Sequence, residues 1–147
     1  MDYMKEALKL AEKAYANGDI PVGAVIVKDG KIIAKGYNKK NKNGNPLCHA
    51  EIIAINKACK VVGDFRLQDC DMYVTKEPCI MCFGAILSAR IKRVFYGASD
   101  LKYGVVDNAD KLNFNHKCEW IKGVNETECS AILSRFFKEL RDNNNAN

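Results

Sequence analysis

Two short segments of the sequence contain residue types that bind metals and move protons. The first is His49-Ala50-Glu51, and the second, Pro78-Cys79-Ile80-Met81-Cys82, places its first cysteine 30 residues after His49. Cys79 and Cys82 are three positions apart, so on a helix they share one face and can bind one metal ion together. Two thiolates and one imidazole make three protein ligands for Zn²⁺ and leave a fourth position open. Such an open site is typical of catalytic zinc, whereas structural zinc has four protein ligands.

Glu51 is the expected proton-transfer residue of this site. Zinc lowers the pKa of water bound to it from about 15.7 to roughly 7, so hydroxide forms at neutral pH and a neighbouring base has to move the proton. Residues two apart on an ideal helix face in different directions. We therefore expect His49 to lie in the first helical turn, with both side chains leaning around the helix end and Glu51 near the metal without binding it.

Other interpretations of the cysteines remain open at this point. A Cys-x-x-Cys pair alone also occurs in redox pairs and in one half of a structural zinc site. Cys79 and Cys82 could form such a closed site with His116 and Cys118. The remaining cysteines, which adjoin His49 or lie in apolar patterns, are interpreted as packing residues: Cys48, Cys59, Cys70 and Cys129.

Length, composition and charge limit the surroundings of this site. The 147 residues, 48% of them hydrophobic and 28% charged, are ordinary for one globular domain and exclude a disordered or collagen-like chain. The net charge of +5 suits a nucleic-acid partner without requiring one. Seven cysteines cannot all pair with one another, and neither a signal segment nor a membrane-spanning run is evident. We expect a reducing cytoplasm and no membrane association.

Hydrophobic periodicity predicts the elements that carry the two segments. Residues 2–17 are predicted to form a helix, and two apolar runs around Asp29-Gly30 are predicted to form a hairpin. The polar residues 38–46 are expected to form a loop. Further helices are expected over 49–62, after Pro78 as far as about Arg90, and over 126–141. Strands are expected over 22–27, 32–37, 72–75, 93–97 and about 118–122, and an irregular stretch is expected over 99–117.

Strands that alternate with helices after an initial hairpin indicate an α/β fold. We expect a three-layer α-β-α sandwich with a central mixed sheet that begins with an N-terminal antiparallel hairpin. No repeat or linker divides the chain, so one domain is expected over residues 1–141. Residues 142–147 contain four asparagines and no apolar anchor, and we expect this tail to fray.

The two segments together resemble the signature of the zinc-dependent nucleoside and nucleobase deaminases, His-x-Glu followed by Pro-Cys-x-x-Cys. The resemblance extends from about residue 4 to 141 and implies a cytidine-deaminase-like fold. Within this superfamily the sequence is most similar to the bacterial tRNA-specific adenosine deaminases, which convert the wobble adenosine of an anticodon to inosine. The segments that carry this similarity are 20–25, 36–38, 49–52, 73–75, 77–82, 84–86, 100–104, 115–116 and, most specifically, 136–141.

The resemblance implies a metal site and a reaction. His49, Cys79 and Cys82 would bind one Zn²⁺ per chain, and Glu51 would be the general acid and base. Glu51 would take a proton from zinc-bound water, pass it to N1 of the base as hydroxide attacks C6, and then protonate the departing amine. An anticodon loop is already single-stranded, so its target base leaves the stack at little cost.

The resemblance also implies substrate contacts and partners. The partners would be a tRNA anticodon stem-loop and a second copy of the chain, with both copies of the homodimer shaping the RNA site. Asn38 would hydrogen-bond the purine ring. The other contacts would be made to the flanking nucleotides by Asp100 and Lys102, and to the stem-loop by Phe137 and Arg141 on the last helix.

One segment departs from the pattern of the tRNA enzymes. After Gly104 those enzymes usually have a Gly/Ser-containing stretch and a longer helix, whereas residues 105–110 here read Val-Val-Asp-Asn-Ala-Asp. The departure keeps open a free nucleobase or nucleoside of the guanine or cytosine type as the substrate, and residues 57–63 and 95–96 also resemble bacterial guanine deaminases. A third hypothesis is a zinc-stabilised RNA-binding module without catalysis, which predicts four protein ligands and no open position.

Overall fold

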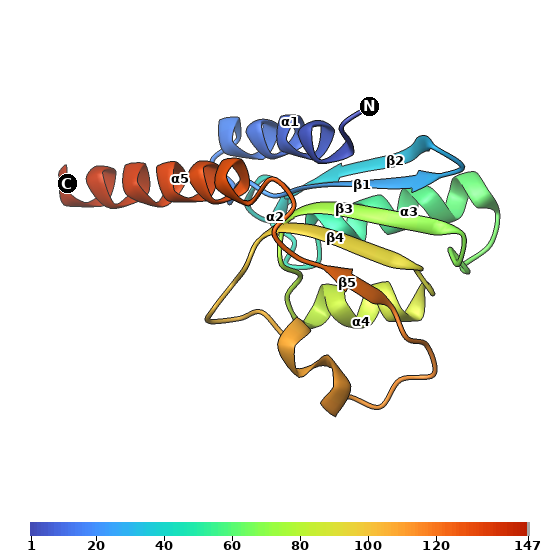
Figure 1. Ribbon diagram of the computed structural model, residues 1–147. Coiled ribbons are helices and arrows are strands. Elements are labelled where there is room, and N and C mark those ends of the chain that lie inside the picture. Colours follow the sequence, from blue (N-terminus) through green and yellow to red (C-terminus); the bar gives the residue numbers. More distant parts are fainter. Residues whose placement is uncertain (147) are drawn as a thin grey trace.

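The computed structural model describes residues 1–146, and within them five strands form one sheet in the order β2-β1-β3-β4-β5 (Figure 1). β1 (Gly23–Lys28) lies antiparallel between β2 (Lys31–Tyr37) and β3 (Cys70–Lys76). β4 (Arg93–Ala98) and the short β5 (Glu119–Ile121) continue the sheet parallel to β3. The expected mixed sheet with an N-terminal antiparallel hairpin is confirmed.

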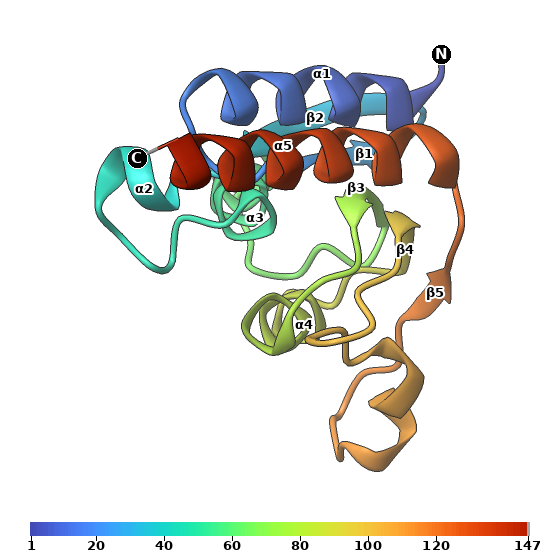
Figure 2. The ribbon, with the colours of Figure 1, turned by 90° about the vertical axis from the view of Figure 1, so that its left-hand side faces the viewer.

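Helices cover both faces of this sheet. α1 (Tyr3–Ala16) and α5 (Glu126–Ala146) lie side by side on one face, and α3 (Ala50–Val62) and α4 (Ile80–Ser88) lie on the other (Figures 1 and 2). The main apolar core is buried between the sheet, α3 and α4, and a smaller one lies beneath α1 and α5. The three-layer α-β-α sandwich expected from the sequence is confirmed.

Two glycines on neighbouring strands let helices approach the sheet closely from opposite sides. A Cβ atom on Gly23 would overlap the backbone of α1 at Ala7, and one on Gly36 would overlap the backbone of α3 at Ala50. Because Ala50 directly follows His49, the contact at Gly36 fixes the position of the helix end that carries the first chemical segment.

The structure differs from the sequence-based expectation at a short helix. The loop expected over 38–46 contains α2 (Lys40–Asn43), which has no buried residue of its own. The carboxylate of Asp19, buried and 22 residues earlier in the chain, accepts hydrogen bonds from the backbone N–H groups of Asn41 and Lys42. A tertiary contact therefore stabilises a turn that hydrophobic periodicity could not reveal.

In the C-terminal third, two further elements differ from the sequence-based expectation. The stretch expected to be irregular contains a 3₁₀ helix, η1 (Val106–Lys111). α5 continues beyond Arg141, where the helix was expected to end, as far as Ala146, while Asn147 lies outside the described residues. No helix among residues 1–146 has the length and apolar character needed to cross a membrane.

Candidate metal centre and active site

The two chemical segments meet at one end of the sheet because each begins a helix there. His49 is the N-cap of α3 and Cys79 is the N-cap of α4, and both have extended backbone conformations. Cys79 follows the carboxyl end of β3 by three residues. The carboxyl ends of parallel strands are the usual location of ligand sites in open α/β sheets.

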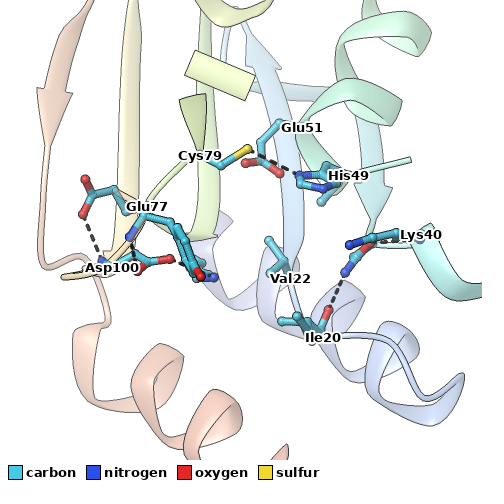
Figure 3. Close-up of a pocket in the computed structure, with 12 residues that line it drawn as sticks. Ile20, Val22, Lys40, His49, Glu51, Glu77, Cys79 and Asp100 are labelled. Atoms are coloured by element: carbon cyan, nitrogen blue, oxygen red, sulfur yellow. Dashed lines mark hydrogen bonds and ion pairs between the residues drawn. The ribbon is translucent and has the colours of Figure 1, made fainter. Parts of the chain in front are cut away.

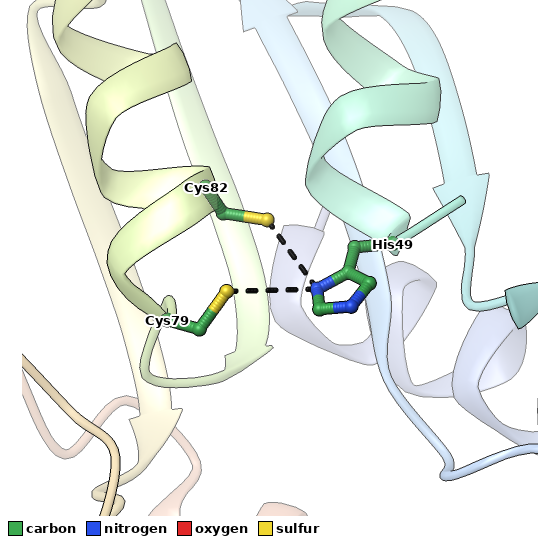
Figure 4. A group of neighbouring side chains, drawn as sticks. All are labelled: His49, Cys79 and Cys82. Atoms are coloured by element: carbon green, nitrogen blue, oxygen red, sulfur yellow. Dashed lines mark hydrogen bonds between the residues drawn. The ribbon is translucent and has the colours of Figure 1, made fainter. Parts of the chain in front are cut away.

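His49, Cys79 and Cys82 form a compact cluster (Figure 4). The Nδ1 atom of His49 lies 3.6 Å from each cysteine Sγ, and the three ligand atoms all lie within 4.8 Å of one another. A tetrahedral Zn²⁺ with Zn–S of about 2.3 Å and Zn–N of about 2.05 Å would place its sulfur and nitrogen ligands about 3.6 Å apart. The observed spacing therefore fits one zinc ion, and two thiols with one imidazole are a donor set that zinc prefers.

The four-ligand alternative is wrong for the residues that the structure describes. The metal-ligating group there consists of the three residues above, without His116 or Cys118. The Nε2 atom of His116 instead donates a hydrogen bond to the carbonyl oxygen of Ile91, at 2.7 Å. The cluster thus retains the three-ligand composition of a catalytic site.

Charge is unequally distributed between the two cysteines. A hydrogen bond from the Cys82 thiol, together with His49, lowers the pKa of Cys79 to about 3. The same hydrogen bond to Cys79, together with burial, raises the pKa of the Cys82 thiol. The pKa of His49 is raised, chiefly by its hydrogen bond to Cys79. Without metal, the pair therefore holds one thiolate, which is the form of cysteine that binds zinc.

Glu51 lies in the first turn of α3, beside Cys79 and His49 (Figure 3). His49 does not lie in the first helical turn, where it was expected, but one position before it, as the N-cap with an extended backbone. The conflict between residues two apart on a helix therefore does not arise. Only 4% of the Glu51 surface is exposed, and this burial raises the pKa of its carboxyl group. A raised carboxyl pKa suits a group that both accepts and returns a proton near neutral pH.

A cavity of about 190 Å³ opens over this cluster. His49, Glu51 and Cys79 lie at its inner end (Figure 3). Ile20, Val22 and Lys40 lie on one side of it, and Glu77 and Asp100 lie on the other (Figure 3). The lining also includes Asn38, which hydrogen-bonds to Ile20 and Lys40, and Lys76 and Tyr103, which contact Asp100. Pockets for drug-sized ligands measure about 300–1,000 Å³, so this one suits a single base rather than a larger part of a nucleotide.

Asn38 lies in the cavity wall. Its side-chain amide donates to the carbonyl oxygen of Ile20 and accepts from the backbone N–H of Lys40. An amide group has two donors and two acceptor sites. One donor and one acceptor site therefore remain for a ligand, while the other pair holds the side chain in place.

Asp100 and Lys102 are placed differently from each other. Asp100 lines the cavity, but its Oδ1 accepts from the backbone N–H groups of Lys102 and Tyr103, and its Oδ2 pairs with Lys76 at 3.1 Å. The carboxylate thus organises its own loop. Lys102 is exposed and lies outside the cavity lining, and its Nζ atom lies 5.2 Å from the centroid of the Tyr103 ring.

Phe137 and Arg141 lie on α5, outside the cavity lining. Phe136 is buried and packs edge-to-face against Tyr15 of α1, whereas Phe137 is half-buried and Arg141 is exposed. The C-terminal half of α5 projects beyond the rest of the molecule on the side where α2 lies (Figures 1 and 2). The two residues are therefore available to a ligand larger than the cavity, although they do not line it.

Sequence reasoning missed three residues that shape the cavity. Asp19 and Glu77 are buried carboxylates that accept backbone hydrogen bonds from segments far along the chain. Tyr103 contributes an exposed ring to the cavity wall. The sequence offered one signal for them. Glu77 lies between an apolar strand and the Pro-Cys motif, and a charge buried there requires a hydrogen-bonding partner.

Comparison with known proteins gives three consistent results. The family model described as MafB19-like deaminase matches residues 1–141. A tRNA-specific adenosine deaminase of Rickettsia bellii is 47% identical over 146 residues, which cover 95% of this chain and 100% of the relative. A solved structure from a study of A-to-I editing by tRNA:A34 deaminases superposes with a TM-score of 0.86 at 39% identity, covering 89% of this chain and 98% of the other.

A guanine deaminase from Bacillus subtilis is also similar. Its structure is 48% identical, covers 74% of this chain and 67% of its own, and superposes with a TM-score of 0.63. The local identity is thus as high as in the tRNA-editing proteins, but it extends over less of the chain and the folds superpose less well.

Proposed function

This chain belongs to the MafB19-like deaminase family, and on that premise we propose that it converts the wobble adenosine of a tRNA anticodon loop to inosine. The observation that carries the proposal is the cavity: it is the size of one base, and the metal cluster and a buried glutamate lie at its inner end. The reaction consumes one water and releases ammonia from C6 of the base.

We propose that His49, Cys79 and Cys82 hold one Zn²⁺ per chain. When bound, zinc would supply a nucleophile at neutral pH by lowering the pKa of water toward 7. Glu51 is not needed as a ligand, so its carboxylate is free to move protons. It would take the proton of the attacking water, deliver it to N1 of adenine, and later protonate the amine that leaves C6.

The size of the cavity supports a substrate whose target base is presented alone. A cavity of about 190 Å³ leaves the ribose, the phosphates and the neighbouring nucleotides outside. The projecting end of α5 offers Arg141 and the half-buried Phe137 to those outer parts. A single-stranded loop that splays its bases fits this arrangement.

The test compares two substrates with the zinc-loaded protein. One is an anticodon stem-loop RNA with adenosine at the wobble position, and the other is free guanine. We expect ammonia release and inosine formation from the RNA, with the same stem-loop carrying guanosine at that position as the unreactive control. Ammonia release from guanine alone would reject the proposal.

Free guanine is the second candidate because of the 48% identity to the Bacillus subtilis guanine deaminase. The cavity that suits one base of an RNA also suits a free base. Under this alternative the exposed residues of α5 would have no part in catalysis. Truncating Phe137 and Arg141 to alanine together would then leave the rate unchanged, whereas the RNA proposal predicts weaker substrate binding.

We further propose that two copies of the chain pair. Large apolar side chains are exposed around α4 and the segment that follows β4, and Phe114 packs edge-to-face on Phe83 of α4 at the rim of a surface hollow. Three exposed members of this group are Ile80, Leu112 and Phe114. A second copy would remove them from water. Sedimentation should give twice the chain mass, and Phe114→Asp should shift it toward the monomer.

The proposed setting is the cytoplasm. The seven cysteines of the chain are all free in the structure, as expected where thiols remain reduced. Fractionation of cells should recover the protein with soluble tRNA-processing enzymes.

A further inference from the structure

We propose that Tyr103 stacks on the nucleotide next to the target base, and that Glu77 is the positioning residue that holds Tyr103 at the cavity mouth. The inference rests on the proposed RNA substrate and deepens it, because it assigns the flanking nucleotide to a particular side chain. It begins from the size of the cavity, which leaves every flanking base outside.

Tyr103 is the aromatic residue in the cavity lining, and 63% of its surface is exposed. Exposed aromatic rings beside a single-stranded site are platforms on which bases stack. The ammonium group of Lys102 lies 5.2 Å from the centroid of the Tyr103 ring. A base on the ring would therefore have a cation nearby for its phosphate.

Glu77 fixes the loop that carries this ring. Its carboxylate accepts hydrogen bonds from the backbone N–H groups of Asp100, at 3.0 Å, and Val106, at 3.2 Å. These two residues bracket Tyr103, so one buried side chain holds both ends of its loop. Gly104 packs directly against the same carboxylate, which a Cβ atom at that position would overlap.

Asp100 supports the loop from inside. Its Oδ1 accepts from the backbone N–H of Tyr103 at 2.9 Å, and its Oδ2 pairs with Lys76, the residue before Glu77. Figure 3 shows Glu77 and Asp100 together on one side of the cavity. With both oxygens of Asp100 engaged, the side chains that this loop leaves exposed are Leu101, Lys102 and Tyr103, and of these Tyr103 lines the cavity.

The first test measures deamination of the anticodon stem-loop by the zinc-loaded protein. Tyr103→Ala should raise KM about tenfold with little change in kcat, since loss of one base stack costs about that factor. Tyr103→Phe, which keeps the ring, should restore most of the affinity. Phe65→Ala is the matched control, because Phe65 is also exposed beside a cation, Arg66, but lies at the opposite end of β3.

The second test asks whether Glu77 acts through Tyr103. Glu77→Gln replaces one acceptor oxygen by an NH₂ group that cannot accept from a backbone N–H, so it should raise KM while one zinc per chain is retained. In the Tyr103→Ala background the same substitution should have little further effect. Gly104→Ala, which displaces the loop by overlap rather than by loss of a hydrogen bond, should reproduce the rise in KM.

The outcomes separate the inference from the proposed function. An unchanged KM for Tyr103→Ala, in a preparation whose wild type deaminates the stem-loop, would overturn the stacking role. Independent, additive effects of Glu77→Gln and Tyr103→Ala would overturn the positioning role. A wild-type protein that does not deaminate the stem-loop would refute the proposed function, and the inference with it.

Discussion

His49 and Cys79 occupy equivalent positions: each is the N-cap of its helix, and neither side chain makes a capping hydrogen bond. An N-cap side chain ordinarily satisfies one of the free N–H groups of the first turn. Here both side chains point to a common centre instead, where their ligand atoms lie 3.6 Å apart. The two helix ends that form the metal site therefore lack the stabilisation of a side-chain N-cap hydrogen bond.

Replacing His49 by asparagine should stabilise the metal-free protein. Asparagine is a strong N-cap residue, so His49→Asn should raise the free energy of unfolding of the metal-free protein by about 1 kcal/mol. The same substitution should abolish zinc binding. Urea denaturation in the presence of a chelator measures the first effect, and metal analysis measures the second. His116→Asn, at the other histidine of the chain, should retain the metal. Retention of zinc by His49→Asn would contradict its role as a ligand.

Replacing Glu51 by glutamine should remove catalysis and leave the metal in place. The amide has the shape of the carboxyl group but cannot accept and return a proton, so kcat should fall by about 10²–10⁴-fold. Inosine formation and zinc content are measured on the same preparation. Glu126→Gln, on the exposed start of α5, serves as the control and should have the wild-type rate. Normal activity of Glu51→Gln would refute the mechanism.

Removing the metal should make Cys79 the most reactive thiol at low pH. Its pKa is lowered to about 3, so the thiolate is already complete at pH 5 and the rate of alkylation should not rise between pH 5 and 8. Burial raises the pKa of Cys118 and of Cys129 to about 12, and these thiols should stay unmodified over that range. Mass spectrometry after iodoacetamide treatment reports each site. Added zinc should protect Cys79, and a failure to do so would contradict the assigned ligand.

Gly36→Ala should disturb the metal site by displacing the start of α3, which His49 caps. The added methyl group would overlap the backbone of Ala50, so we expect a loss of about 1–3 kcal/mol in stability and weaker zinc binding as His49 moves. Gly84→Ala, inside α4 where no atom lies within 4 Å of the new Cβ, should instead stabilise the protein by about 0.5–1 kcal/mol. Thermal unfolding of both variants checks the pair. Equal effects at the two glycines would contradict the close packing at Gly36.

The metal ligands could be predicted from the sequence because their signal is local. Cys79 and Cys82 share a helix face through their spacing, and His49 precedes an apolar helical pattern. The sheet was predictable for the same reason, since a tight turn at Asp29-Gly30 and short apolar runs mark its strands. These features depend on residues a few positions apart.

The cavity walls could not be predicted in this way. α2 exists because Asp19 accepts hydrogen bonds from residues more than 20 positions later, and the loop around Tyr103 depends on Glu77 across a similar distance. Asp100 is an example: the resemblance implies a nucleotide contact, and only the structure shows that both of its oxygens also interact within the protein. The hydrogen-bond partners of a carboxylate depend on the folded structure and cannot be predicted from residues nearby in the sequence.

The projecting end of α5 has a consequence for the helix–coil equilibrium. Residues 138–145 of this helix are exposed, so little tertiary packing supports their hydrogen bonds, and the consecutive asparagines there are weak helix formers. These turns depend mainly on cooperativity with the buried turns around Phe136. Warming should therefore unwind them from the C-terminal end long before the domain melts, and a polyanion laid along Arg141 would restore their helicity.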